Sequence, residues 1–147
     1  MERGDIAEYS ILGQSCIWEG VLAAPPEGVT AKAKYKFYER ANNWETAIPM
    51  WKPNDLAVRS LADCVNRLGI GTDVITFLHP EAVDPIYEWL LRKGVRTTVL
   101  WYDSPKDYEI DLRYNRGIQT VYVSTDEEAF TIGFRAHVVK PNTAWRI

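Results

Sequence analysis

The feature that most constrains the fold is a regular alternation of helix-like and strand-like segments between Pro53 and Val139. Buried strands appear as short uncharged runs, whereas helices place apolar residues three or four positions apart. The two patterns follow one another in the order helix, strand, helix, strand, linker, strand, helix, strand. Such alternation is typical of a mainly parallel sheet with helices on both faces. We therefore predict a three-layer, Rossmann-like α/β fold with a mainly parallel central sheet.

The clearest unit of this alternation closes it, between Thr120 and Val139. An uncharged β-branched run predicts a buried strand, and a capping residue followed by acids predicts the start of a helix. A glycine then stops the helix before a second strand. The residues are Thr120 to Val123 for the first strand, Ser124, Thr125 or Asp126 as the cap, Glu127 and Glu128 in the first turn, Gly133 as the stop, and Arg135 to Val139 for the second strand. Because α/β proteins place ligand sites where a strand ends, this acidic turn is the main functional clue.

The remaining elements are predicted from periodicity, caps and glycine stops. The first is a helix over residues 53–68, capped by Asn54 or Asp55, with an apolar stripe of Val58, Leu61, Val65 and Leu68. A strand over 72–78 follows, and then a helix that starts at Pro85 after an Asp84 cap. A strand over 95–101 and a linker over 102–117 complete the series. The part before Pro53 is less regular. It contains a strand running into a glycine turn over 16–22 and an alternating strand over 29–38 whose lysines form either a solvated face or an anion-binding stripe.

Composition limits the class of protein further. The 147 residues fit a single domain over 1–147, and 46% hydrophobic with 25% charged residues is an ordinary globular balance. A net charge of -3 provides no basic field for nucleic acid. No apolar run is long enough to cross a membrane, and two cysteines are too few for a disulfide framework. We expect a reduced, cytoplasmic protein without membrane partners.

Four stretches carry a further signal. They are Ile17 to Leu22 with Glu19 inside it, a strand ending near Thr76, a basic region containing Lys106 or Arg113, and the acidic turn Asp126 to Glu128. In this order they resemble the four motifs of the haloacid dehalogenase-like superfamily. The layout is most similar to small, nearly capless members such as the phosphatase domain of polynucleotide kinase–phosphatase and related phage phosphatases. The resemblance covers roughly residues 16–141 and implies a single domain of that fold.

The first of these motifs departs from the family pattern. The resemblance implies an aspartate nucleophile, which forms an aspartyl-phosphate, at the position that Ile17 occupies. An aliphatic side chain cannot attack phosphorus. The expectation is therefore an inactive member that serves as a binding or accessory module, with Glu19, Thr76, Lys106 and Asp126 as vestigial site residues. The alternative is a magnesium-dependent phosphohydrolase acting on a nucleotide or small phosphate ester.

Cofactor and partner expectations follow from the same residues. The resemblance implies magnesium held by carboxylates of the first and last motifs, here Glu19, Asp126 and Glu127, but with few ligands we expect weak binding or none. His79 and His137 have no metal spacing, and Cys16 is expected to be an inert buried thiol. Tryptophan is a favoured interface anchor, so Trp18, Trp44, Trp51 and Trp145 indicate either a protein partner, self-association, or packing within the irregular N-terminal half.

Overall fold

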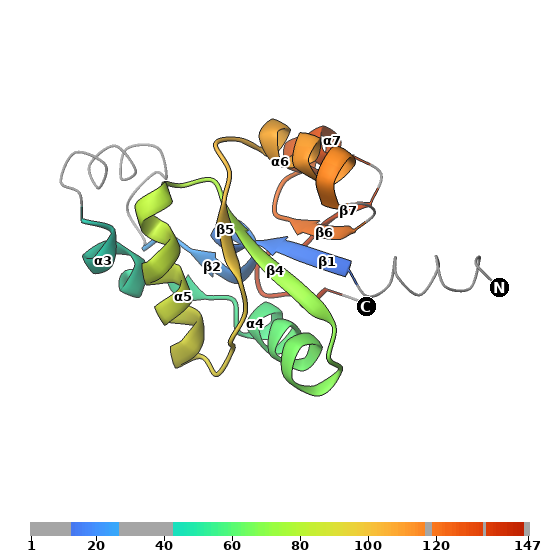
Figure 1. Cartoon of the computed structure of the whole chain (residues 1–147). Helices are drawn as coiled ribbons and strands as arrows, with labels where there is room; N and C mark the ends of the chain where they lie inside the picture. The colour runs from blue at the N-terminus through green and yellow to red at the C-terminus, as the bar shows by residue number, and fades with distance from the viewer. Residues whose placement is uncertain (1–12, 27–42, 117–118, 134, 146–147) are drawn as a thin grey trace.

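The computed structural model describes residues 13–26, 43–116, 119–133 and 135–145. Five parallel strands form one sheet, and helices pack against it (Figure 1). The α/β, Rossmann-like prediction is thereby confirmed. The strands are β1 (Gly13–Ile17), β4 (Gly71–Thr76), β5 (Val99–Trp101), β6 (Thr120–Val123) and β7 (Ala136–Val138), with a separate antiparallel pair of β2 (Ala23–Ala24) and β3 (Lys52–Pro53). The helices are α3 (Trp44–Ala47), α4 (Asp55–Ala62), α5 (Val83–Arg92), α6 (Pro105–Asp111) and α7 (Asp126–Ile132).

Short helical segments join or extend these elements. They are η1 (Trp18–Leu22), η2 (Ile48–Met50), η3 (Asp63–Arg67), η4 (Pro80–Ala82) and η5 (Leu112–Arg116). No described helix is both long and apolar enough to cross a lipid bilayer. The expected strand over 29–38, with its lysine face, lies outside the described residues.

The strand order is β5-β4-β1-β6-β7, which places β1 in the middle. The chain adds β4 and β5 on one side of β1 and then returns to add β6 and β7 on the other. In open parallel sheets, such a reversal opens a crevice beyond the carboxyl ends of the strands, where ligands usually bind. The corresponding point here is the end of β1, between the ends of β4 and β6. We refer to the turns that meet at this point as the crevice.

Successive residues of β1 face opposite sides of the sheet. Ser15 is hydrogen-bonded to Tyr108 of α6, whereas the neighbouring Cys16 interacts with Cys64 of η3. Helices α6 and α4–η3 therefore cover opposite faces, as Figure 1 shows. Burial raises the pKa of the Cys16 thiol, and a thiol held in its neutral form is a poor nucleophile. This fits the expected inert role of Cys16.

Helix α6 replaces the linker that the sequence predicted over 102–117. The start of α6 carries the usual helix signal of a capping serine followed by proline, Ser104 and Pro105, but the mixed composition of the segment obscured it. In the structure the Ser104 hydroxyl accepts a hydrogen bond from Asp107 N at 3.2 Å. Apolar periodicity is weak here because the face toward the sheet is partly polar. Its buried residues include Tyr108 and Glu109.

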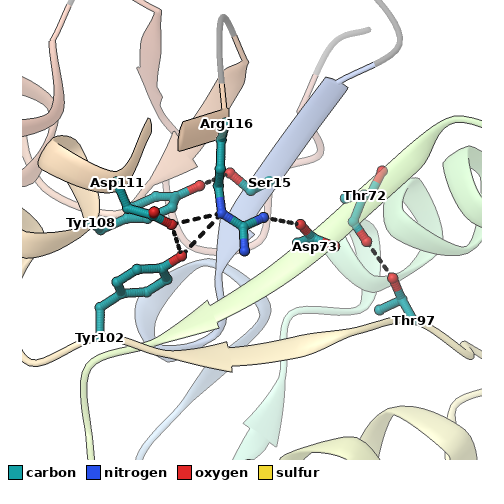
Figure 2. A network of polar contacts seen from close by, with 8 residues as sticks. All are labelled: Ser15, Thr72, Asp73, Thr97, Tyr102, Tyr108, Asp111 and Arg116. Atoms are coloured by element: carbon teal, nitrogen blue, oxygen red, sulfur yellow. Dashed lines mark hydrogen bonds and ion pairs between the residues drawn. The ribbon is translucent and has the colours of Figure 1, made fainter. Parts of the chain in front are cut away.

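A polar network fixes α6 and η5 to the sheet. Figure 2 shows the Arg116 guanidinium between two carboxylates, with Nη1 2.9 Å from Asp73 of β4 and Nε 2.8 Å from Asp111 of α6. Arg116 Nε also donates to the Tyr102 hydroxyl at 3.1 Å, and that hydroxyl bonds Asp111. The hydrogen bonds lower the pKa of Asp111 to about 2, with the one from Tyr102 contributing most. These polar contacts add to the aromatic packing of Tyr108 against Phe77 and Tyr102.

Several predicted boundaries are corrected. Helix α5 begins at Val83 rather than at Pro85, because the 3₁₀ turn η4, capped by His79, leads directly into it, and Asp84 lies in its first turn instead of capping it. Leu68 is exposed rather than part of the buried stripe of the preceding helix, and Cys64 takes the inward position. Strand β5 is limited to its last three residues.

The four tryptophans are buried, with exposed fractions of 0% for Trp18, 2% for Trp44, 4% for Trp51 and 6% for Trp145. Trp18 packs against Trp51 and Trp89 at centroid distances of 4.6 and 5.6 Å. They are therefore part of the core and cannot be surface anchors. Of the alternatives that the sequence left open for these residues, internal packing is the one observed.

Candidate functional site

The crevice at the end of β1 is formed by the turn η1. Ile17 is the last residue of β1, pairs in register with Ile75, and is completely buried. The chain then turns sharply, with a non-helical ψ of 121° at Glu19 and a positive φ of 92° at Gly20. This turn directs the Glu19 carboxyl toward the end of β4 and leaves Ile17 in the core.

Glu19 is bound firmly to the end of β4. Its Oε2 accepts a hydrogen bond from Thr76 Oγ1 at 3.2 Å and another from Phe77 N at 3.0 Å. Its Oε1 is shielded from solvent and has no hydrogen-bond partner among the described residues. Burial of the carboxyl group outweighs these hydrogen bonds and raises the pKa of Glu19 to about 7. An acid with this pKa can hold or release a proton near neutral pH.

The other wall of the crevice is the turn between β6 and α7. Thr125 caps α7 by accepting a hydrogen bond from Glu128 N at 3.1 Å. Glu128 Oε1 in turn accepts from Ser124 Oγ at 3.1 Å, and more distantly from Ser124 N and Thr125 Oγ1 at 3.4 Å. This reciprocal arrangement is a capping box, a device that stabilises helix starts. The Glu128 charge also contributes, as the smallest effect, to the raised pKa of Glu19.

Gly20 brings the two walls into direct contact. A Cβ atom added at Gly20 would lie 2.5 Å from Ser124 Cβ, closer than two carbon atoms can approach. Its φ of 92° is also one that residues with side chains rarely adopt. Both constraints require glycine, so this residue lets the η1 turn pack on the β6–α7 turn.

The structure unites only part of the predicted site. Glu19 and Thr76 meet as expected. Lys106 lies on α6, is mostly exposed, and pairs with Glu109 at 3.3 Å. Asp126 and Glu127 are exposed in the first turn of α7, with no recorded contact to Glu19. The site therefore consists of Glu19 and Thr76 facing Ser124 and Glu128.

The sequence did not predict two contacts at this site, that of the Phe77 backbone N–H with Glu19 and those of the Ser124 side chain. The Phe77 backbone N–H leaves no trace in the side-chain pattern, since any residue there could donate it. Ser124 was expected to cap the helix, and its backbone was also considered for binding an anion, whereas its hydroxyl contacts Glu128 and its Cβ lies where a side chain at Gly20 would have to go. The Thr-x-x-Glu spacing of Thr125 and Glu128 is a capping-box pattern, and it could have indicated that Glu128 turns back toward the start of α7.

The carboxylates do not fit the magnesium that the resemblance implies. Magnesium needs several free oxygens in octahedral geometry, and Glu128 Oε1 is already engaged. Within the described part of the chain, no three acidic, histidine or cysteine side chains are grouped so that they could hold a metal ion. Glu19 is thus better suited to holding a proton than a metal ion.

Comparisons with family models, with curated proteins and with solved structures give no match to this chain. The geometry of the crevice is therefore the basis for any functional conclusion.

Replacing Gly20 with alanine should destabilise the protein by about 2–5 kcal/mol, since a positive φ costs about 1–2 kcal/mol and overpacking about 1–3 kcal/mol. The matched control is Gly94→Ala. Gly94 also has a positive φ of 80° but no atom within 4 Å of its added Cβ, so only the backbone cost of about 1–2 kcal/mol should be lost. Urea unfolding measures both. Ser124→Gly should partly rescue Gly20→Ala, and the contact with Ser124 is refuted if the two alanine variants lose equal stability.

Replacing Glu19 with glutamine should change how stability depends on pH. Since the folded pKa of Glu19 lies near 7, above its usual 4.5, its contribution is full below pH 4.5 and is lost as pH rises through 7. The loss amounts to about 3 kcal/mol. Glutamine does not titrate, so the variant should be more stable than the native protein at about pH 8 and similar at about pH 5. Urea unfolding at both pH values checks this, and an equal difference at the two would contradict it.

Proposed function

We propose that this chain is a degenerate relative of the haloacid dehalogenase-like superfamily, with its three-layer fold, and that it acts as an interaction module rather than as a phosphohydrolase. The order of parts supports the relationship. Glu19 follows the central strand, Thr76 ends the neighbouring strand β4, and the acidic turn follows β6 on the other side. Those are the places that the resemblance gives to the first, second and fourth motifs.

The observation that carries the functional proposal is the state of Ile17. It occupies the position of the nucleophile, is completely buried, and has no atom that can attack phosphorus. The nearest hydroxyl on β4, that of Thr76, is also fully buried and donates its hydrogen to Glu19. A covalent phosphoryl intermediate therefore cannot form on Ile17, and Thr76 is not accessible to a substrate.

The interaction role is supported by apolar surface that the fold leaves uncovered. Several large side chains are exposed, among them Phe130 at 91%, Tyr114 at 75% and Trp101 at 36%. Exposed aromatic side chains are frequent anchors of protein interfaces. We therefore propose these three exposed side chains as interface anchors, in place of the four tryptophans, which are buried.

The alternative function is a magnesium-dependent phosphohydrolase that uses Glu19 with the acids of α7. One observation favours it, namely that Glu19 Oε1 has no partner among the described residues and so has the capacity for a further contact. This alternative would require Glu128 to leave Ser124, and Asp126 to turn toward Glu19.

The proposal predicts no phosphohydrolase activity. Assays with p-nitrophenyl phosphate and with nucleoside phosphates, in excess magnesium, should give background rates, because Ile17 cannot act as a nucleophile and the described acids are not grouped as a metal site. The control is Glu19→Gln, which should give the same background rate as the native protein. Turnover that depends on Glu19 and on Asp126 would instead establish the alternative function.

A further inference from the structure

Strand β5 is the outer strand on its side of the described sheet, and its pairing with β4 shows which backbone groups are free. Val74 N donates to Thr98 O at 2.9 Å, and Tyr102 N donates to Thr76 O at 3.1 Å. The N–H and C=O of one strand residue point to the same side, and the side alternates along the strand. The groups of Val99 and Trp101 therefore point away from β4, toward the outer edge of the described sheet, and Thr97 lies two residues before the strand begins.

This edge lacks the features that usually protect edge strands. Natural edges carry lysine, proline or bulges that prevent pairing with another chain. The run from Thr97 to Tyr102 is Thr-Thr-Val-Leu-Trp-Tyr, with no charge, no proline and no glycine. Such a β-branched and aromatic segment pairs readily with another strand. Its only charged neighbour at the start is Arg96.

A groove lies beside the beginning of this edge. Its volume is about 620 Å³, and it is lined from the β5 side by Arg96 to Val99, from β4 by Gly71 to Asp73, and from α5 by Val83, Asp84 and Tyr87. At its edge the Thr97 hydroxyl bonds the Thr72 carbonyl, as Figure 2 shows. At the other end of the strand, the Trp101 side chain is 36% exposed.

We propose that two copies of this chain associate through β5, antiparallel and about a two-fold axis at Val99. With Val99 opposite Val99, Thr97 of each copy lies opposite Trp101 of the other. The outward N–H and C=O groups of Val99 then face those of Val99 in the second copy, which is the hydrogen-bonded pairing of an antiparallel ladder. In this pairing Thr97 joins the strand opposite Trp101, so β5 lengthens by two residues at its start. The two sheets become one continuous sheet of ten strands.

The same register explains the groove and the exposed tryptophan together. Because Trp101 of one copy comes beside Thr97 of the other, its indole reaches the end of the strand where the groove opens. The two-fold axis repeats this contact, so each copy gives one tryptophan and receives one. Arg96, which borders the groove, is then placed to lie on an aromatic ring of the second copy.

A second copy fits this edge better than an unrelated peptide. The pairing is self-complementary, since one segment supplies the strand, the groove and the anchor. The net charge of the paired run is zero, so two copies do not repel along it. The inference rests on the proposed interaction role, whose partner it identifies as the chain itself.

Light scattering coupled to size-exclusion chromatography tests the association. Over micromolar to several hundred micromolar protein, the measured mass should rise from 16.9 kDa toward twice that value. Trp101→Lys should weaken association by about tenfold or more, because it removes the anchor and places a charged side chain at the paired edge. The control, Phe130→Lys, alters a more exposed aromatic on α7, away from the paired edge, and should associate like the native protein. Circular dichroism establishes that both variants fold.

Amide hydrogen exchange of the native protein provides a test without substitution. The Val99 and Trp101 amides should exchange more slowly at high than at low protein concentration, whereas the exposed end of α7 should not change. A monomer at the highest concentration overturns the proposal, as does a dimer that Phe130→Lys disrupts and Trp101→Lys does not. Neither result bears on whether the protein hydrolyses phosphate esters. Failure of the β5 association is therefore distinguishable from failure of the proposed function, which the phosphohydrolase assays test.

Discussion

The central position of β1 is the constraint on which the rest of the structure depends. Hydrogen bonds to β4 on one side and β6 on the other enclose this strand, so its residues must be uncharged and closely packed. Ser15, Cys16 and Ile17 are all completely buried. The chain can leave this position only through a sharp turn at the carboxyl end of the strand. Gly20 makes that turn possible, and the turn determines where Glu19 lies.

The crevice shows how a polar site can persist without the chemistry that the resemblance implies. Glu19 joins η1 to β4, and Glu128 stabilises the start of α7. Each carboxylate thus has a structural partner, while Ile17 contributes packing in place of a nucleophile. A buried acid with a pKa of about 7 costs stability when it ionises. The two acids thus hold neighbouring segments of the chain together.

The parallel sheet and most helices could be predicted because each has a local signal. The uncharged run ending at Val123 and the acids after Thr125 specify β6 and α7 without help from the rest of the chain. Helix α6 was missed because its inward face mixes Tyr108 with the charged Glu109, so apolar periodicity is weak. Arg116 also contacts Asp73 43 positions earlier, a pairing that no local pattern reveals.

The candidate site could be predicted only in part for a similar reason. The meeting of Glu19 with Thr76 follows from strand order. The Phe77 N–H contact and the approach of Ser124 to Gly20 depend on the exact path of the backbone. The burial of Trp18 and Trp51 could not be predicted either, since irregular segments have no periodicity from which an inward face can be inferred.

The central claim is that the crevice at the end of β1 is closed by hydrogen bonds and is not a magnesium site. Nuclear magnetic resonance measures this directly, by following the backbone amides of Gly20, Phe77 and Ser124 while magnesium chloride is added at constant ionic strength. The account predicts that these three signals remain where they are, apart from small changes shared with the whole protein. Saturable shifts confined to them, and abolished in Glu19→Gln, would contradict it.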